Sequence, residues 1–247
     1  MRLITDCHIH TDWDFASLFL LYSAPYYFLL ALFYDITPLS ILLNLAIQLL
    51  TNVLPFLLLR PLNPHNSALR TPVTSNALLA VNIPIKAYVT LFAAAFYALV
   101  VYTSLYTWLP VHLVSNFDSI RTLEHAHGAQ LPLIALACLP LGLAAKDFLF
   151  VPSIYYARNA VAKRFDPKTA TLGETVAWNF GLSGWGFREA VLAERTALLV
   201  VMTLAEALAK VYGTIDGAEQ WGALGWGAVF AVAGLSTGCG LAWVGDV

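Results

Sequence analysis

Charged residues are scarce in this chain of 247 residues, where Asp, Glu, Lys and Arg together make up 11%. A soluble domain has about a quarter charged residues, because polar groups have to cover its water-facing surface. Hydrophobic residues account for 59% of this chain instead. The composition therefore excludes an ordinary soluble domain and predicts an integral membrane protein in contact with membrane lipids.

Cysteines are also few, and the chain has no excess of positive charge and no nucleotide or metal motif. The three cysteines, Cys7, Cys138 and Cys239, are too few and too scattered for a disulfide framework. A net charge of −2 argues against nucleic acid as a partner. The chain contains no Walker A loop, no H-E-x-x-H and no C-x-x-C. No cofactor is therefore expected, and the sequence leaves open whether the protein is an enzyme.

What the chain does have is six apolar runs, most of them about 20 residues long, enough for one helix through a hydrocarbon core of roughly 30 Å. These runs lack the ten-residue alternating pattern of barrel strands. The sequence therefore predicts an all-α transmembrane bundle with about six spans, after an N-terminal arm at 1–14 and with a basic loop at 152–195. The spans are expected at 15–34, 38–59, 85–109, 131–151, 196–212 and 221–243. No Pro or Gly occurs between Phe187 and Gly213, so the fifth helix is expected to extend back to Phe187.

The distribution of Lys and Arg predicts the orientation of this bundle. With six spans, 11 of the 13 cations fall on the side that holds both termini and the loops at 60–84 and 152–195, or at span ends facing it. The opposite side has only Arg121, and Lys210 lies inside the fifth span. Because basic loops stay in the cytoplasm, both termini are predicted to be cytoplasmic. The eleven are Arg2, Arg60, Arg70, Lys86, Lys146, Arg158, Lys163, Arg164, Lys168, Arg188 and Arg195.

Polar side chains inside the spans form the candidate intramembrane site. Asn44, Gln48 and Asn52 recur every four residues along the second span and so share one face of a helix. Glu206 and Lys210 are spaced for an ion pair within the fifth span. Polar groups at membrane depth need partners, so Asn44, Gln48, Asn52 and Glu206 are expected to face the bundle interior. Lys210 lies close to the end of its helix, so its side chain can extend outward. Two interpretations remain open, namely hydrogen bonds between helices and a path for a substrate or an ion.

Small residues spaced four apart mark one face of the sixth span. This pattern lets helix backbones approach closely, and it predicts packing against the other helices of the bundle. Association with a second copy or with other membrane proteins through the same face is the alternative. The residues are Ala223, Gly227, Ala231, Gly234, Gly238 and Ala242.

Two histidine pairs have the spacing of metal ligands. His8 and His10 lie in the N-terminal arm, and His125 and His127 lie in the loop before the fourth span. Neither pair is accompanied by a further set of His, Asp or Glu residues that would complete four ligands. No metal site is predicted.

Three classes of function fit these features. The first is a non-catalytic scaffold, assembly factor or accessory factor of an endomembrane, with the endoplasmic reticulum as the expected location and the plasma membrane as the alternative. The second is an intramembrane enzyme acting on a lipid or isoprenoid-like substrate, and the third is a small transporter or channel. The lack of catalytic motifs and the small-residue face favour the first class. A cavity lined by the polar residues of the spans would favour an enzyme.

Overall fold

The computed structural model describes residues 12–59, 82–118, 120–124, 128, 130–156 and 187–244. These residues are almost entirely helical, and the one β feature among them is an isolated bridge between Phe117 and Ala218. The predicted all-α fold is thereby confirmed. The helices are α2 (Asp12–Phe33), α3 (Pro38–Leu59), α6 (Ile83–Tyr106), α7 (Leu109–Asn116), α9 (Leu131–Ala137), α10 (Leu139–Ala145), α11 (Val151–Tyr156), α13 (Phe187–Glu206) and α14 (Gln220–Val244), with π-helices η1 (Lys146–Phe150) and η3 (Ala207–Tyr212).

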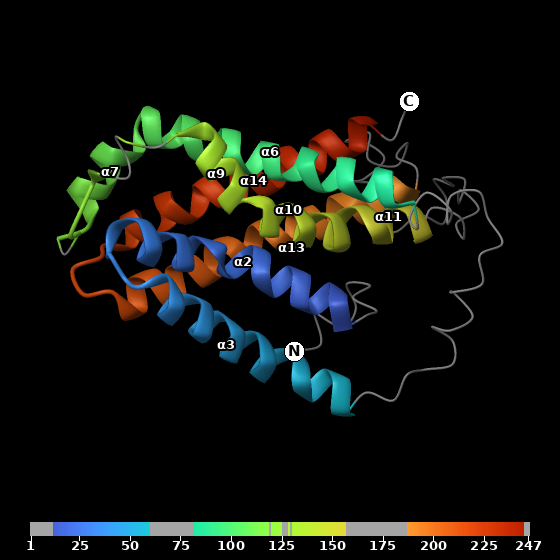
Figure 1. Cartoon of the computed structure of the whole chain (residues 1–247), viewed down its shortest axis with the longest axis horizontal. Coiled ribbons are helices and arrows are strands. Elements are labelled where there is room, and N and C mark those ends of the chain that lie inside the picture. The colour runs from blue at the N-terminus through green and yellow to red at the C-terminus, as the bar shows by residue number, and fades with distance from the viewer. Residues whose placement is uncertain are drawn as a thin grey trace, which may run out of the picture.

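The long helices run along the long axis of the molecule, and α3 lies at one edge (Figure 1). Helix α14 packs against α13 and α6, and α10 packs against α6 and α2. Helix α3 has its main packing contact with α2 alone. The bundle therefore consists of a tightly packed group of helices with one peripheral helix.

Prolines and one aspartate account for several helix ends. Pro38 begins α3, and Pro84 lies in the first turn of α6. The N–H groups of a first turn have no acceptor within the helix, so proline, which lacks an N–H, costs no hydrogen bond there. The turn between α2 and α3 contains Asp35 with φ of 52°, a left-handed conformation that Asp tolerates better than most residues. These signals explain why α3 begins where the sequence predicts.

The predicted span at 131–151 is bent rather than straight. Helices α9 and α10 meet at Cys138, and the axis changes direction there by 48°. Pro140 lies in the first turn of α10, and because proline cannot donate to the preceding turn, a continuous helix is interrupted. The prediction of one regular helix was wrong at this point.

Two helices begin before the predicted spans that they contain. Helix α2 begins at Asp12, inside the expected arm, and α13 begins at Phe187, inside the expected 152–195 loop. The fifth helix runs without a break through α13 and η3 to Tyr212, as the lack of Pro and Gly indicates. As a consequence, Arg195 belongs to a helix of the bundle rather than to a loop.

Four helices in the described part of the chain are long and apolar enough to cross a membrane, or five if the bent pair is counted as one. The four are α2, α3, α6 and α14, and the bent pair is α9 with the helix that follows it. The helix α13–η3 is not among them, and it carries Arg195 and Glu206. The count of six spans therefore stays a prediction.

Three connections meet at the end of the bundle where α7 lies, called here the α7 end (Figure 1). Asp118 N donates to Gly217 O at 2.9 Å, and Glu219 N donates to Asn116 O at 2.9 Å. Arg121 N donates to Phe33 O at 3.1 Å. The connections that follow α2, α7 and η3 thus lie together, as an alternating helical bundle requires.

Trp226 of α14 lies at the centre of the packed core. Its side chain is fully buried, and its Nε1–H donates to Pro25 O of α2 at 2.6 Å. The rings of Phe33 and Phe230 contact it edge-on, with centroids 5.7 and 5.5 Å away. An indole N–H needs a partner when buried, and the backbone of α2 supplies one here.

Candidate functional site

Lys210 of η3 is the centre of the polar cluster within the bundle. Its Nζ lies 2.6 Å from Glu206 Oε1, one turn earlier in the same helix, and it donates to Gln48 Oε1 of α3 at 2.7 Å. The Lys210 and Glu206 side chains are 22% and 21% exposed. The cluster therefore joins η3 to the peripheral helix α3 through one ammonium group.

Three aromatic rings of α2 surround the same ammonium group. Lys210 Nζ lies 5.7 Å from the ring centroids of Phe19 and Tyr26, and 6.0 Å from that of Tyr27. These distances are within the range at which a cation is attracted to a ring face. The rings, the carboxylate and the amide together replace the water that a lysine loses on burial.

The two asparagines of α3 have different surroundings. Asn44 Oδ1 accepts a hydrogen bond from the Tyr27 hydroxyl at 3.0 Å, although the Asn44 side chain is exposed. Asn52 is half-buried, and its Nδ2 donates to Gln48 O of its own helix at 2.8 Å. The structure thus brings Asn44, Gln48, Glu206 and Lys210 into one network with Tyr27, and it leaves Asn52 one turn away.

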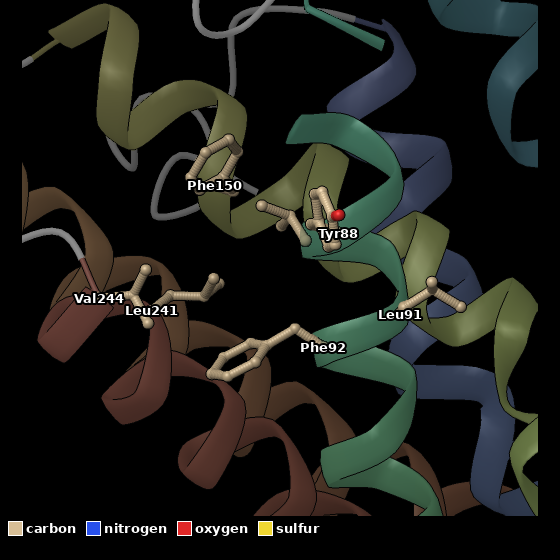
Figure 2. Close-up of a pocket in the computed structure, with 7 residues that line it drawn as sticks. Tyr88, Leu91, Phe92, Phe150, Leu241 and Val244 are labelled. Atoms are coloured by element: carbon tan, nitrogen blue, oxygen red, sulfur yellow. The ribbon is translucent and has the colours of Figure 1, made fainter. Parts of the chain in front are cut away.

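This network consists of groups that already have partners. Glu206 and Lys210 neutralise each other, and Gln48 and Tyr27 connect them to α3 and α2. A pocket lies elsewhere, between α6, η1 and α14, and none of the candidate polar residues lines it (Figure 2). The arrangement joins three helices, α2, α3 and η3, through polar contacts.

A second ion pair was missed by the sequence interpretation. Arg195 of α13 is 1% exposed, and its Nη2 lies 3.3 Å from Asp14 Oδ2 of α2. Its Nη1 donates to Phe148 O of η1 at 2.9 Å, and its guanidinium lies 5.1 Å from the Phe148 ring centroid. Arg195 was assigned to a cytoplasmic loop and Asp14 to the arm. The uninterrupted run from Phe187 predicted the helix that carries Arg195, but it did not predict the contacts with Asp14 and Phe148.

The small-residue face of α14 packs against the helix α13–η3. A Cβ atom added at Gly227 would contact Ala207 Cβ at 2.6 Å, and one at Gly238 would contact the side chain of Thr196. At Gly234 it would meet Leu199 at 3.0 Å. The predicted packing role is present in the structure, and association with a second copy or with other membrane proteins through the same face stays a prediction.

Residues 234–238 of α14 also match the pattern G-x-S-x-G, which the sequence interpretation missed. In hydrolases this pattern places a serine on a sharp turn between a strand and a helix. Here Ser236 lies inside a continuous helix and donates to Ala233 O at 2.9 Å. The match is a consequence of the small-residue face and gives no nucleophile elbow.

The histidine pairs His8/His10 and His125/His127 lie outside the described residues. Within the described ranges, no group of three His, Cys, Asp or Glu side chains has the geometry to hold a metal ion. The absence of a metal site in the whole chain stays a prediction.

Comparison with known proteins gives one match. A family model described as the Bouquet formation protein 3 C-terminal domain matches residues 83–225, which is more than half of the chain. The match runs from the start of α6 into α14, so it includes Arg195, Glu206 and Lys210 but neither α2 nor α3. No curated protein and no solved structure matches the chain.

Proposed function

Because the chain belongs to the family of the Bouquet formation protein 3 C-terminal domain, we propose that it is a non-catalytic membrane component that serves bouquet formation. In this proposal the protein spans the nuclear envelope or the endoplasmic reticulum membrane continuous with it. Its termini are in the cytoplasm or nucleoplasm. The family match is the single observation that carries the proposal, since bouquet formation is a meiotic, telomere-associated process.

The exposed surface of the bundle supports a location in a membrane. Helix α3 presents a row of large apolar side chains outward, which water would solvate poorly. Lipid hydrocarbon is the surrounding that suits them. The exposed apolar residues of α3 are Leu39, Leu42, Leu43, Ile47, Leu50 and Leu54.

The paired state of the polar residues supports a non-catalytic role. A catalytic site needs a substrate space beside its acids and bases. Glu206 and Lys210 instead bond to each other, and Lys210 also bonds to Gln48. The pocket in Figure 2 is lined almost wholly by carbon atoms, and neither Glu206 nor Lys210 is among its lining residues. These contacts give α2, α3 and η3 fixed relative positions, which is what a scaffold requires.

The proposal is tested by location and by phenotype in the organism that makes the protein. A fluorescent fusion should label the nuclear rim, and alkaline carbonate should leave the protein in the membrane pellet. In cells lacking the protein, telomeres should fail to cluster in meiotic prophase, as measured by fluorescence imaging of a telomere probe. Wild-type telomere clustering in those cells, or a signal confined to the plasma membrane, would contradict the proposal.

A further inference from the structure

A side crevice lies at the end of the bundle opposite the α7 end. It has a volume of about 420 Å³ and is formed where α6 begins, α14 ends and η1 passes between them (Figure 2). In this view Phe92 points from α6 toward Leu241 of α14, with Phe150 of η1 above them. The lining residues are Tyr88, Val89, Leu91, Phe92, Phe150, Leu241 and Val244.

The crevice offers hydrocarbon and almost no hydrogen-bonding groups. The hydroxyl of Tyr88 is the only side-chain polar atom among its lining residues. Its volume is within the roughly 300–1,000 Å³ of small-molecule sites, but such sites usually have several polar groups that orient the ligand. A polar cofactor would leave its own hydrogen-bonding groups unpaired here, which is unfavourable. The occupant must therefore be apolar along its whole inserted length.

The crevice combines a buried floor with an open mouth. Val89 and Leu241 are buried, whereas the Tyr88 side chain at its edge is 74% exposed. An apolar chain inserted from the side would contact α6, η1 and α14 at once, unlike a chain that lies against a single helix. Such a site holds an acyl chain more tightly than the surrounding lipid shell does, because the chain makes van der Waals contacts with three helices rather than one.

Charged and aromatic side chains occur next to the mouth. Lys86 is half-buried and precedes Val89 by three residues, so the two are neighbours on the surface of α6. Its side chain leans toward the start of the helix, away from the bundle centre. Trp243, next to the lining residue Val244, is 72% exposed. A lysine and a tryptophan at a helix end are typical of the level of lipid headgroups.

We propose that this crevice binds one acyl chain of a glycerophospholipid, with the phosphate of that lipid beside Lys86. The acyl chain accounts for the apolar lining, and the phosphate accounts for a cation at the mouth. This assignment rests on the proposed membrane location, because only there do phospholipids surround the bundle.

The matched pair Leu241→Trp and Leu235→Trp tests the acyl-chain site. Leu241 lines the crevice, whereas Leu235 is an exposed residue of the same helix and does not line it. Both variants and the wild type are reconstituted in nanodiscs of phosphatidylcholine and phosphatidylserine, and lipids retained after transfer to detergent are counted by native mass spectrometry. We expect one retained phospholipid per wild-type chain, an occupancy at least about tenfold lower in Leu241→Trp, and no change in Leu235→Trp.

A headgroup contact and a milder blocking variant complete the test. Lys86→Gln should lower the preference for phosphatidylserine over phosphatidylcholine and leave chain binding intact. Val244→Trp narrows the mouth of the crevice at a half-exposed position and should also lower lipid occupancy. If Leu241→Trp fails to fold, Val244→Trp still tests the site. Circular dichroism checks the helical content of each variant.

Two outcomes would overturn the assignment. The first is a wild-type protein that retains no phospholipid, and the second is equal retention by the wild type, Val244→Trp and Leu241→Trp. Failure of the membrane location itself has a different signature, since the wild-type protein would then be released from cell membranes by alkaline carbonate. If the protein stays in the membrane pellet but retains no phospholipid, only the acyl-chain assignment of the crevice is contradicted, and the proposed membrane location stands.

Discussion

Two cations of the bundle, Arg195 and Lys210, differ in how far they are buried and in which groups surround them. Arg195 is fully buried, with a carboxylate, a backbone carbonyl and a ring around its guanidinium. Lys210 is about one-fifth exposed and has a carboxylate, an amide and three rings around its ammonium. Since removal of one partner is most harmful where the other stays buried, Arg195 should be the more sensitive position.

The substitution Arg195→Met is expected to destabilise the protein by about 3–5 kcal/mol, because it leaves the Asp14 carboxylate without its guanidinium partner in a buried place. The double variant Asp14→Leu with Arg195→Met should recover part of that loss. Denaturant unfolding in detergent micelles, followed by circular dichroism, measures both. Arg121→Met, at an exposed side chain, serves as the control and should change stability by less than about 0.5 kcal/mol. An Arg195→Met protein as stable as this control would contradict the role of the ion pair.

The substitution Gln48→Leu removes one acceptor of Lys210 and is expected to cost about 1 kcal/mol, the usual value of such a bond between membrane helices. Asn52→Leu is the matched control, because its amide donates only within α3 in the described contacts. Thermal unfolding in detergent compares the two. Because the cluster is proposed to be structural, telomere clustering should persist in cells with Gln48→Leu. If Glu206→Gln abolishes clustering while the protein accumulates and folds normally, the site has a functional role instead.

At the level of helices, Gly142 marks a close approach between the backbones of α10 and α6. A Cβ atom at this position of α10 would contact Thr90 O and lie 2.8 Å from Ala94 Cβ, both in α6. Gly142→Ala is therefore expected to push the two helices apart and to lower stability by about 1–3 kcal/mol. Gly213→Ala, where nothing lies within 4 Å, should change it by less than about 0.5 kcal/mol. Melting temperatures in detergent test this, and similar values for both variants would contradict it.

The sequence predicted helices well where length and apolar composition decide the structure. Helix α3 begins and ends at the predicted residues, because Pro38 and the apolar run define it. The bend at Cys138 was missed, because an apolar run with Pro140 inside it has the same composition whether it is straight or broken. The burial of Arg195 was missed for a related reason: the sequence does not say that Asp14 and Phe148 O lie close enough to be its partners inside the bundle.

The candidate site was predictable in its membership but not in its contacts. The spacing of Glu206 and Lys210 indicated their ion pair, which the structure contains. The common spacing of Gln48 and Asn52 suggested one shared role, yet Asn52 bonds to the backbone of its own helix, an alternative that short amide side chains always have. The aromatic rings of α2 around Lys210 could not be foreseen, because nothing in the sequence says which helices are neighbours.

For the molecule as a whole, the orientation in the membrane is the principal prediction. In a variant without native cysteines, Arg164→Cys should react with an impermeant maleimide only after the cytoplasmic side is opened. Arg121→Cys, at the α7 end, should react from the opposite side. The reason is the concentration of cations in the loops on one side of six predicted spans. Gel-shift detection of the label measures both, and a reversed pattern would contradict the orientation.

The hydrogen bonds that join the connections at the α7 end set an order for events during translation. Phe33 O can accept its hydrogen bonds from Arg121 N and Thr122 N only after about half the chain has been synthesised. Asn116 O can accept its hydrogen bond only after Glu219 has been synthesised. In the proposed membrane location, the first helices would be inserted while that end is still open. Closure of the bundle is therefore one of the last steps of biogenesis. A chain truncated before Glu219 would lack the hydrogen bond to Asn116 that joins two connections at the α7 end, and we expect it to be degraded.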